Sequence, residues 1–382
     1  MINGINTIGF VGGGQLGKMM ILKAKELGFR IAVLDTASDC PCSSIADKLI
    51  VAKNFNDKKA YQELAKQSDI ITYEFEHIDA DTLGELENAG HTIYPSVNSL
   101  KTIKDKLTQK QALAKSGIAV PEFETVNTTD DIYAYYNTHK KPFFLKARTG
   151  GYDGKGNYFV KSLDDIEKAL KFLNVPVNLL MTEKAVDFQI EVSVIATRGI
   201  DGQCVVYPVS ENEHKNSILD VTKVPAVINS DTQKKVMEVA KQVMECFKGV
   251  GTFCVELFVN EKLGEVLVNE VAPRVHNSGH YSIEACYTSQ FESHIRAIVG
   301  LGLGNPDLKV KAAVMKNVIG DCDGKAKFYG VEDAYKIKNV NMHIYCKPHV
   351  KAGRKMGHYT IVGDSLNECL EKLGRIDIKV RS

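Results

Sequence analysis

The first hundred residues alternate short apolar runs with segments of helical periodicity. Buried strands are indicated by the apolar runs at 5–11, 31–35, 70–72 and 91–94. Between the first two runs, residues 15–27 have the pattern of an amphipathic helix. Strands that alternate with helices in this way build parallel sheets from βαβ units. We therefore expect a small parallel βαβ domain of the α/β class at the start of the chain.

The pattern changes after residue 100, where the regular alternation gives way to a mixed α+β arrangement. A lysine-rich helix is predicted over about 100–116, and residues 121–183 have the pattern of strands joined by tight turns. Three further predicted elements are a helix at 163–173, a long helix at 232–247 and a closing hairpin at about 340–361. The fold class expected from the pattern is therefore α/β followed by α+β.

Composition narrows the class of protein. With 382 residues, 44% of them hydrophobic and 25% charged, the chain is typical of a globular enzyme with two or three domains. Its net charge of +1 provides no overall field for nucleic acid or an anionic membrane, and no apolar run approaches the about 20 residues of a membrane span. Nine scattered cysteines without metal-ligand spacing, and no secretory signal, favour a reducing compartment. We therefore expect a cytoplasmic protein with no nucleic-acid or membrane partner.

A glycine-rich loop follows the first predicted strand. Gly12–Gly17 fits the pattern G-x-G-x-x-G between a strand and a helix, and Asp35 ends the second strand. Glycines at such a turn let backbone amides approach an anion at the helix N-terminus, as in dinucleotide-binding domains. The same glycines can instead hold another phosphate or serve helix–strand packing. A dinucleotide-dependent dehydrogenase of the NAD type is therefore one alternative function.

A second glycine-rich loop lies between two predicted strands. The first strand, 143–146, places Phe144 and Lys146 on one face, because side chains alternate along a strand. The loop itself, 148–156, contains four glycines and two cationic side chains. It leads into another strand rather than a helix, unlike the P-loop of Walker-type NTPases. Such a loop suits a flap that closes over phosphates, and a loose surface hairpin is the alternative.

Two acidic residues are predicted to face each other across a hairpin. A short turn joins the β-rich runs 252–259 and 265–272, so that residues whose numbers sum to 526 pair. Glu256 and Glu270 satisfy this sum, and their like charges would require neutralisation. Mg²⁺ prefers carboxylate oxygens and also binds phosphate, which predicts a metal site here. Asn269 could supply a further oxygen, although alternation would normally turn it to the opposite face. The alternative is a register shifted by one, or a lysine beside each glutamate.

Residues 270–280 continue directly from the second carboxylate and carry an arginine, an asparagine and two histidines. Arg274 offers a planar guanidinium fork for a small oxyanion such as bicarbonate. His276 and His280 have the spacing of two zinc ligands on a helix, but Pro273 and the nearby asparagine and glycine disfavour a helix there. No third zinc ligand has a recognisable spacing. The segment therefore favours an active site beside the paired acids over a zinc site.

Together these strings resemble the ATP-grasp superfamily and, within it, the 5-(carboxyamino)imidazole ribonucleotide synthetases, the ATPase subunit of phosphoribosylaminoimidazole carboxylase. The resemblance is carried by Phe10–Gly17, Tyr73–Glu76, Lys106–Lys110, Arg148–Gly156 and Asn269–His280. It implies an ATP-grasp fold with an N-terminal Rossmann-like βαβ domain. The three domains implied are a substrate-binding domain at 1–100, an ATP-clamping domain with the glycine-rich flap at 101–185, and a large domain with the metal site and the C-terminal hairpin at 186–382.

The resemblance also implies roles for particular residues. The implied ATP-binding residues are Lys106, Lys146, Gly151, Gly154, Glu183, Lys184, Ala185, Val186, Glu191, His214, Asn269 and Glu270. The implied substrate-binding residues are Gly14, Gln15, Leu16, Glu76, Tyr152, Asp153, Arg274, His276, Asn277, Arg354 and Lys355. The implied metal ligands are Glu256 and Glu270, and the candidate catalytic residues are Asp153, Arg274, His276 and Lys355. Among the ATP-binding residues, the two lysines would contact phosphates, the strand 183–186 adenine, and Glu191 the ribose.

The activity implied by the resemblance is a ligase reaction of de novo purine (IMP) biosynthesis. ATP and bicarbonate would form carboxyphosphate, which carboxylates the exocyclic amine of 5-aminoimidazole ribonucleotide to give 5-(carboxyamino)imidazole ribonucleotide, ADP and phosphate. The implied cofactors are ATP and Mg²⁺ or Mn²⁺, and the implied assembly is a homodimer. The alternatives are another ATP-grasp ligase, such as a formate-dependent ribonucleotide transformylase or biotin carboxylase, the NAD-type dehydrogenase, and a catalytically inactive nucleotide sensor.

Overall fold

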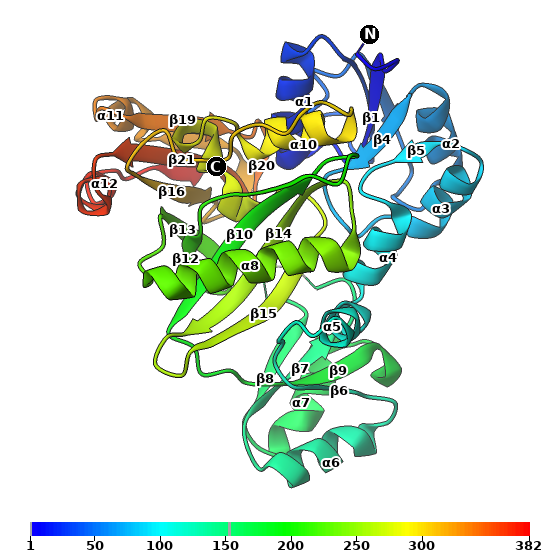
Figure 1. Cartoon of the computed structure of the whole chain (residues 1–382), viewed down its shortest axis with the longest axis vertical. Coiled ribbons are helices and arrows are strands. Elements are labelled where there is room, and N and C mark those ends of the chain that lie inside the picture. The colour runs from blue at the N-terminus through cyan, green and yellow to red at the C-terminus, as the bar shows by residue number, and fades with distance from the viewer. Residues whose placement is uncertain (1, 152–153) are drawn as a thin grey trace.

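The computed structural model describes residues 2–151 and 154–382, and three main β-sheets organise them (Figure 1). A five-stranded sheet forms the N-terminal unit, a four-stranded sheet lies within residues 123–184, and a nine-stranded sheet takes up much of the remainder. In Figure 1 the N-terminal unit lies at the top and the four-stranded unit at the bottom, with the large sheet between them. The domain limits at residues 100 and 185 remain predictions.

The N-terminal sheet is parallel, in the order β3-β2-β1-β4-β5. Its strands are β1 Thr7–Val11, β2 Arg30–Asp35, β3 Lys48–Val51, β4 Ile70–Tyr73 and β5 Thr92–Ile93. Its helices are α1 Gln15–Glu26, α2 Lys58–Lys66 and α3 Ala80–Asn88. The predicted strands and first helix are present, because continuous apolar runs are typical of parallel strands that are buried on both faces. β3 was missed because it is an edge strand with mostly exposed or half-buried residues.

The lysine-rich helix predicted over 100–116 is in fact two helices. α4 spans Val97–Lys104 and α5 spans Lys106–Lys115, with extended backbone at Asp105 between them (φ −101°, ψ 112°). The Asp105 carboxylate accepts hydrogen bonds from two backbone amides in the first turn of α5, which caps that helix. It also pairs with Arg148 at 2.6 Å. The single-helix prediction is wrong because this long-range ion pair leaves no local signal.

The four-stranded sheet is antiparallel, in the order β6-β9-β7-β8. Its elements are β6 Phe123–Thr125, α6 Thr129–His139, β7 Phe143–Ala147, β8 Asn157–Val160, α7 Asp164–Leu173, the 3₁₀ turn Val177–Leu179 and β9 Leu180–Lys184. Phe143 and Leu145 of β7 pack with residues of α6 and α7 in one core cluster. Phe144 and Lys146 turn to the opposite face, as predicted, and that face borders the cavity described below.

The nine-stranded sheet has the order β15-β14-β10-β12-β13-β16-β21-β19, with β11 paired to β10. Its strands are β10 Ile190–Arg198, β11 Cys204–Val206, β12 Ser210–Lys215, β13 Ile218–Val224, β14 Gly251–Asn260, β15 Glu265–Ala272, β16 Ala312–Ile319, β19 Val340–Ile344 and β21 Lys355–Gly363. α8, Ser230–Phe247, covers one face of β10, β14 and β15, so their other face is left for the cavity. The pairing of β19 with β21 confirms the predicted closing hairpin.

Short elements complete the C-terminal part of the chain. They are the 3₁₀ turn Asn277–Gly279, α9 Ser282–Ala285, α10 Gln290–Ile298, β17 Gly324–Lys325, β18 Lys327–Tyr329, α11 Val331–Tyr335, β20 His349–Val350, α12 Leu366–Leu373 and β22 Lys379–Arg381. Across residues 2–151 and 154–382, no helix is long and apolar enough to cross a membrane.

α10 joins the N-terminal unit to the large sheet, since it packs against both α1 and β14. Its buried His294 bridges the two units: Nε2 lies 2.9 Å from Thr72 Oγ1 of β4, and Nδ1 accepts a hydrogen bond of 3.1 Å from the Thr252 amide of β14. Phe291 and Ile295 of the same helix share a core cluster with residues of α1. These contacts fix the first glycine loop relative to the carboxylates on β14 and β15.

Candidate active site

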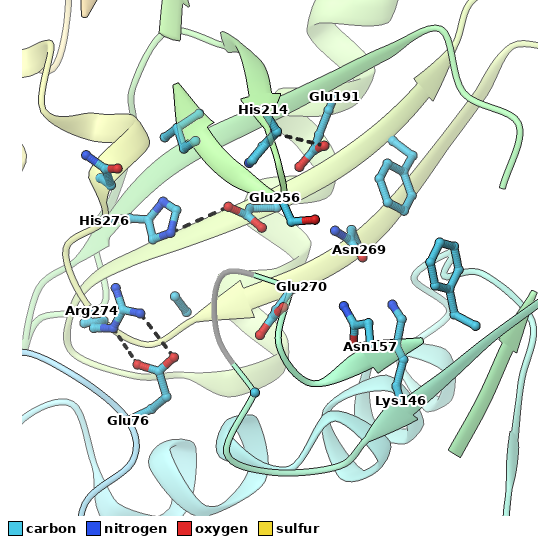
Figure 2. Close-up of a pocket in the computed structure, with 18 of the residues that line it drawn as sticks. Glu76, Lys146, Asn157, Glu191, His214, Glu256, Asn269, Glu270, Arg274 and His276 are labelled. Atoms are coloured by element: carbon cyan, nitrogen blue, oxygen red, sulfur yellow. Dashed lines mark hydrogen bonds and ion pairs between the residues drawn. The ribbon is translucent and has the colours of Figure 1, made fainter. Parts of the chain in front are cut away.

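One cavity of about 680 Å³ lies where the N-terminal unit, the four-stranded unit and the large sheet meet (Figure 2). Its size is that of a typical small-molecule site. The predicted site residues that line it are Gln15, Leu16, Glu76, Lys146, Gly151, Gly154, Glu183, Lys184, Val186, Glu191, His214, Glu256, Asn269, Glu270, Arg274, His276, Asn277 and Lys355. Residues predicted from well-separated segments of the sequence therefore share one cavity.

Three glutamates form the acidic centre of the cavity. Glu256 on β14 and Glu270 on β15 lie directly opposite each other, as predicted, and Glu191 on β10 is close to Glu256. Burial and the negative charges of Glu191 and Glu270 raise the pKa of Glu256 to about 8. Burial likewise raises the pKa of Glu191 to about 7. Carboxyl groups that resist ionising together suit a divalent cation, which would relieve their repulsion.

The hairpin that carries two of these acids contains an irregularity. Asn260 pairs with Glu265, so the paired numbers sum to 525 near the turn, whereas Glu256 still pairs with Glu270. The shift by one residue leaves Asn269 as the extra residue of a β-bulge. Asn269 lines the cavity beside Glu270, so the expectation that alternation turns it away is wrong. The uniform register assumed from the sequence fails because a bulge breaks the alternation.

Arg274 is held by an acidic residue of the N-terminal unit (Figure 2). Its Nε and Nη2 donate to the two Glu76 carboxylate oxygens at 2.5 and 3.1 Å, and its Nη1 donates to the Val275 carbonyl. Burial alone would raise the pKa of Glu76, but Arg274 outweighs burial and lowers it to about 2. The sequence indicated an arginine fork for bicarbonate without this pairing. Three of the five N–H groups of the guanidinium are engaged, which leaves two to meet a ligand.

His276 lies between the acidic centre and a serine. Its Nδ1 is 2.9 Å from Ser278 Oγ, and its Nε2 is 3.6 Å from Glu256 Oε1. Burial, reinforced by the positive charges of Arg274 and Lys355, lowers the pKa of His276 to about 3. The imidazole is therefore neutral near pH 7. A neutral imidazole can accept a proton or ligate a metal.

A buried ion-pair network lies beneath the predicted phosphate-binding lysine. Glu183 contacts both Lys110 and Lys146, and Lys110 pairs with it at 2.7 Å. Lys110 also donates to the Asn269 carbonyl at 3.0 Å. No role was predicted for Lys110, although its helical spacing from Lys106 on α5 could have placed both on one face. Because the Glu183 side chain contacts two lysines, an adenine contact along residues 183–186 would fall to the backbone; β9 itself ends at Lys184, and this contact remains a prediction.

The end of the cavity beyond Lys146 is apolar. The rings of Phe188 and Phe258 stack with their centroids 4.4 Å apart and an interplanar angle of 16°, and Val186 lies nearby in the lining. This flat apolar surface suits a planar base. Neither phenylalanine was predicted as a site residue. Phe258 could have been found from strand alternation, because it follows Glu256 by two residues on β14 and shares its face.

Carboxylates of the protein already occupy the amides of the first glycine loop. The Gly13 amide donates to Asp35 Oδ2 at 2.7 Å, and the amides of Gly14 and Gly17 donate to the buried Glu74 carboxylate. Glu74 thus fills the position at the N-terminus of α1 that a dinucleotide pyrophosphate would need. A second anion there would be repelled in a low-dielectric environment. This geometry argues against the dehydrogenase alternative.

Some predicted residues do not line the cavity. Among the described residues these are Gly14, Ala185, Arg354 and Lys106. Lys106 nevertheless reaches the acidic centre, because it pairs with Glu270 at 2.5 Å. Arg354 donates to the His349 carbonyl at 2.9 Å on the turn before β21. Tyr152 and Asp153 lie outside the described residues. The ligand contacts assigned to individual residues remain predictions.

Family models match three successive parts of the chain. Residues 5–104 match a ribonucleotide synthetase preATP-grasp domain, residues 111–291 an ATP-grasp domain, and residues 313–372 a phosphoribosylaminoimidazole carboxylase C-terminal domain. The first match covers the βαβ sheet with its glycine loop, and the second covers the four-stranded sheet with Lys146 and the part of the large sheet, β10 to β15, that carries Glu256. The predicted ATP-grasp fold with an N-terminal βαβ domain is therefore confirmed.

Whole-chain relatives agree with these matches. The N5-carboxyaminoimidazole ribonucleotide synthase of Bacillus subtilis (strain 168) is 41% identical over 368 residues, which cover 96% of this chain and 94% of the relative. The crystal structure of the synthetase from Thermotoga maritima superposes with a TM-score of 0.89 at 41% identity, covering 99% of both chains. The Aspergillus clavatus enzyme in complex with ADP and 5-aminoimidazole ribonucleotide superposes with a TM-score of 0.88 at 33% identity, covering 97% of both chains. The chain belongs to the N5-carboxyaminoimidazole ribonucleotide synthase family of ATP-grasp ligases.

Proposed function

We propose that the chain catalyses the ATP- and bicarbonate-dependent carboxylation of the exocyclic amine of 5-aminoimidazole ribonucleotide. The products are 5-(carboxyamino)imidazole ribonucleotide, ADP and phosphate, and the reaction belongs to de novo purine biosynthesis. Relatives that carry the name of this activity align with 96% and 99% of the chain. The complex of the Aspergillus clavatus relative contains ADP and 5-aminoimidazole ribonucleotide together, the nucleotide and the acceptor that the reaction requires.

The convergence of three units on one acidic centre carries the proposal. Figure 2 shows Glu256 and Glu270 in the middle of the cavity, with Lys146 on one side and Arg274 with Glu76 on the other. A ligase that activates one substrate with ATP and passes it to a second needs a nucleotide end and an acceptor end with charged groups between them. Positioning of the two substrates across such a centre supplies a large part of the rate enhancement.

The Lys146 end is the nucleotide end in this proposal. The stacked rings of Phe188 and Phe258 would receive the adenine, and backbone groups of residues 183–186, at the end of β9 and just beyond it, would bond its edge. Lys146 and Lys106 would then contact the phosphates. Because phosphoryl transfer depends mainly on positioning and charge neutralisation, these lysines would stabilise the charge that develops as ADP leaves and carboxyphosphate forms.

The facing carboxylates fit a divalent cation, Mg²⁺ or Mn²⁺. Glu256 and Glu270 are opposite neighbours on paired strands, and burial with the neighbouring charges raises the pKa of Glu256. Oxygen ligands held close together are what such a cation requires. In the described residues Lys106 is the cation that pairs with Glu270, so the metal would take its place there. When bound, the cation would neutralise phosphate charge and polarise the transferred phosphoryl group. Glu256 and Glu270 would hold it, and Asn269 offers a further oxygen beside them.

In this proposal the acceptor end binds bicarbonate and the ribonucleotide, and it transfers the proton that the amine loses. The two unengaged N–H groups of Arg274 and the ammonium of Lys355 would bind the anions. The exocyclic amine would attack either carboxyphosphate itself or the CO₂ that carboxyphosphate releases; in both cases the C–N bond forms, phosphate leaves and one amine proton is released. His276 and Asp153 are the candidates to pass that proton to the leaving phosphate. His276 is neutral in the ligand-free site, and an anionic intermediate beside it would raise its low pKa.

The glycine-rich flap would keep water away from carboxyphosphate. A Cβ on Gly151 would lie 2.6 Å from the Gly156 Cα, so only glycines let the two ends of the flap approach this closely. Gly154 has a φ of +78°, and a Cβ there would lie 2.5 Å from the Ser217 Cβ, next to β12 and β13. The described end of the flap therefore packs on the large sheet. Exclusion of water by such a contact favours carboxylation over hydrolysis.

We also propose a homodimer in the cytoplasm, an assembly and location that rest on the family resemblance. Light scattering of the purified protein tests the assembly, because a dimer has twice the mass of the 42.2 kDa chain. A mass equal to one chain at micromolar concentration would contradict it. The proposed chemistry does not depend on the outcome, since every residue invoked above comes from one chain.

The decisive experiment measures ADP formation by the purified protein with ATP, Mg²⁺ and bicarbonate, with and without 5-aminoimidazole ribonucleotide. We expect strong stimulation by the ribonucleotide and incorporation of labelled bicarbonate into the product. ADP formation that is indifferent to the ribonucleotide would contradict the acceptor. The matched control is Lys115→Met, a change of an exposed lysine at the end of α5, which should behave like the unchanged protein.

A further inference from the structure

The strand that carries Glu256 places a thiol on the same face. Cys254 precedes Glu256 by two residues on β14, so both side chains point to one side of the sheet. The strand neighbours of Cys254 are Ala272 on β15 and Ile195 on β10, and the thiol is fully buried. His276 comes from the loop after β15, and its side chain lies close to both Cys254 and Glu256. One ligand atom from each of Cys254, Glu256 and His276 lies within 4.8 Å of the other two.

A serine already orients two of these three groups. Ser278 Oγ lies 2.9 Å from Nδ1 of His276 and 3.6 Å from Sγ of Cys254. With Nδ1 bonded to the hydroxyl, Nε2 of His276 is directed toward Glu256, 3.6 Å away. The Ser278 backbone N–H also approaches Nδ1, at 3.4 Å, so metal binding at Nε2 requires the tautomer in which Nδ1 carries the proton and donates it to the Ser278 hydroxyl. The cluster thus has an outer contact of the kind that a metal centre uses.

We propose that Cys254, Glu256 and His276 bind a thiophilic divalent cation such as Zn²⁺, and that this cation displaces Mg²⁺ from Glu256 and stops the ligase reaction. The three donors are sulfur, nitrogen and oxygen, a set that zinc accepts in tetrahedral sites with water as the fourth ligand. Mg²⁺ strongly prefers oxygen ligands and would not use the thiol. Zn²⁺ and Mg²⁺ would therefore compete for the Glu256 carboxylate.

The geometry requires only a small contraction to close around zinc. Zinc ligands lie about 2.0–2.3 Å from the metal, which separates neighbouring ligand atoms in a tetrahedron by about 3.5 Å. The present separations of up to 4.8 Å thus close by about 1 Å with side-chain rotation. On binding, the Cys254 thiol loses its proton to solvent, and the thiolate and the Glu256 carboxylate offset the charge of the cation. His276 contributes as the neutral imidazole, the form that binds metal.

The binding test uses Cd²⁺ as a spectroscopic probe for the thiol. A cadmium–thiolate bond absorbs in the ultraviolet, so titration of the ATP-free protein reports ligation by sulfur directly. We expect one equivalent of Cd²⁺ to produce this absorption, and Cys254→Ser to abolish it and weaken binding by about tenfold or more. Cys254→Ala is the second variant, because it keeps the apolar packing of the buried position. Cys369→Ser is the matched control, since Cys369 is also fully buried but lies in the C-terminal core.

The inhibition test measures ADP formation while Zn²⁺ is titrated at a fixed Mg²⁺ concentration. We expect added Mg²⁺ to raise the Zn²⁺ concentration needed for half inhibition. The rate of each cysteine variant is compared with the rate of the same variant without zinc. Changing Cys254 should raise the Zn²⁺ concentration needed for half inhibition about tenfold, whereas changing Cys369 should not. This part rests on the proposed function, whereas the Cd²⁺ titration does not require turnover.

The outcomes separate the two proposals. Absorption that persists in both Cys254 variants, or equal zinc sensitivity of those variants and the unchanged protein, would overturn the inferred site. A protein that shows the Cys254-dependent absorption but forms no ADP supports the site and instead contradicts the proposed function.

Discussion

Lys110 gives the most direct test of how buried charges support the nucleotide end of the site. Changing Lys110→Met keeps a long apolar stem but leaves Glu183 with Lys146 as its remaining cation. Lys110 and Glu183 are each only 2% exposed, so water cannot replace the lost charge. Removing one partner of a buried ion pair costs about 3–5 kcal/mol. Because Lys146 still contacts Glu183, we expect the lower end, a loss of about 3 kcal/mol of unfolding free energy.

The same substitution also removes a donor from the bulge beside the carboxylates. The Asn269 carbonyl accepts a hydrogen bond of 3.0 Å from Lys110 Nζ, and an unmade bond of this kind costs about 1 kcal/mol. We further expect ATP to bind more weakly, because Glu183 would hold Lys146 more firmly and withdraw it from the phosphates. Isothermal titration calorimetry with ATP measures this second effect separately from stability.

Urea unfolding followed by circular dichroism is the assay for stability, since the chain has no tryptophan for fluorescence. Lys115→Met, on the exposed end of α5, is the matched control and should change stability by less than about 0.5 kcal/mol. The double variant Lys110→Met with Glu183→Gln removes both charges but leaves the mostly buried Lys146 without its acidic partner, so it should be less stable than Lys110→Met alone. The reasoning is refuted if Lys110→Met unfolds at the same urea concentration as Lys115→Met, or if the double variant is at least as stable as the single one.

Three other features give testable predictions. Glu270→Ala should reduce ADP formation at least about 100-fold and abolish stabilisation by Mg²⁺–ATP in thermal unfolding; full activity would contradict the metal assignment. Gly154→Ala should force the flap away from Ser217, where the added Cβ would lie 2.5 Å from the serine Cβ, so ADP should exceed carboxylated product; a one-to-one ratio would argue against the flap as a water barrier. Burial lowers the pKa of His294 to about 3. Below about pH 6.5 this histidine therefore binds a proton in the unfolded chain but not in the folded protein. The free energy of unfolding should therefore fall as the pH drops from 7 to 5, by about 2 kcal/mol from this group alone. His294→Gln should reduce the pH dependence of urea unfolding by that amount. An unchanged pH dependence in this variant would contradict the low pKa of His294.

The parts of the fold and site that follow local rules could be predicted from the sequence. The βαβ alternation of the first hundred residues, the facing of Glu256 and Glu270, and the shared face of Phe144 and Lys146 depend only on periodicity and on a short turn. These rules need no knowledge of distant partners. The function came from the resemblance of several strings to one family, and composition or spacing alone left several classes open.

The parts that were missed depend on contacts between distant segments. The helix break at Asp105 requires Arg148, which lies in the glycine-rich flap. The pairing of Arg274 with Glu76 joins the large sheet to the N-terminal unit. The bulge at Asn269 changes a register that the turn alone would have set. In each case the deciding partner is remote in sequence, so local patterning carries no information about it.

These long-range pairs also explain how a cavity rich in charge stays stable before ligands arrive. Lys106 is paired with Glu270, Arg274 with Glu76, and Lys146 with Glu183, so these three cationic groups, all assigned to anionic ligands, already have acidic partners. An unpaired buried charge is strongly destabilising, whereas an exchange of partners is not.

We expect ATP with its cation to enter by such an exchange: phosphate oxygens would take the place of Glu270 on Lys106, while Glu270 turns to the cation that accompanies the nucleotide. Neither charge is left alone at any point, which keeps the barrier to binding low. ATP alone would pair with Lys106 but leave Glu270 without a cation, and the cation alone would pair with Glu270 but leave Lys106 without an anion. The pairing of Lys106 with Glu270 thus predicts that the two bind more tightly together than apart, as positive cooperativity between ATP and the divalent ion.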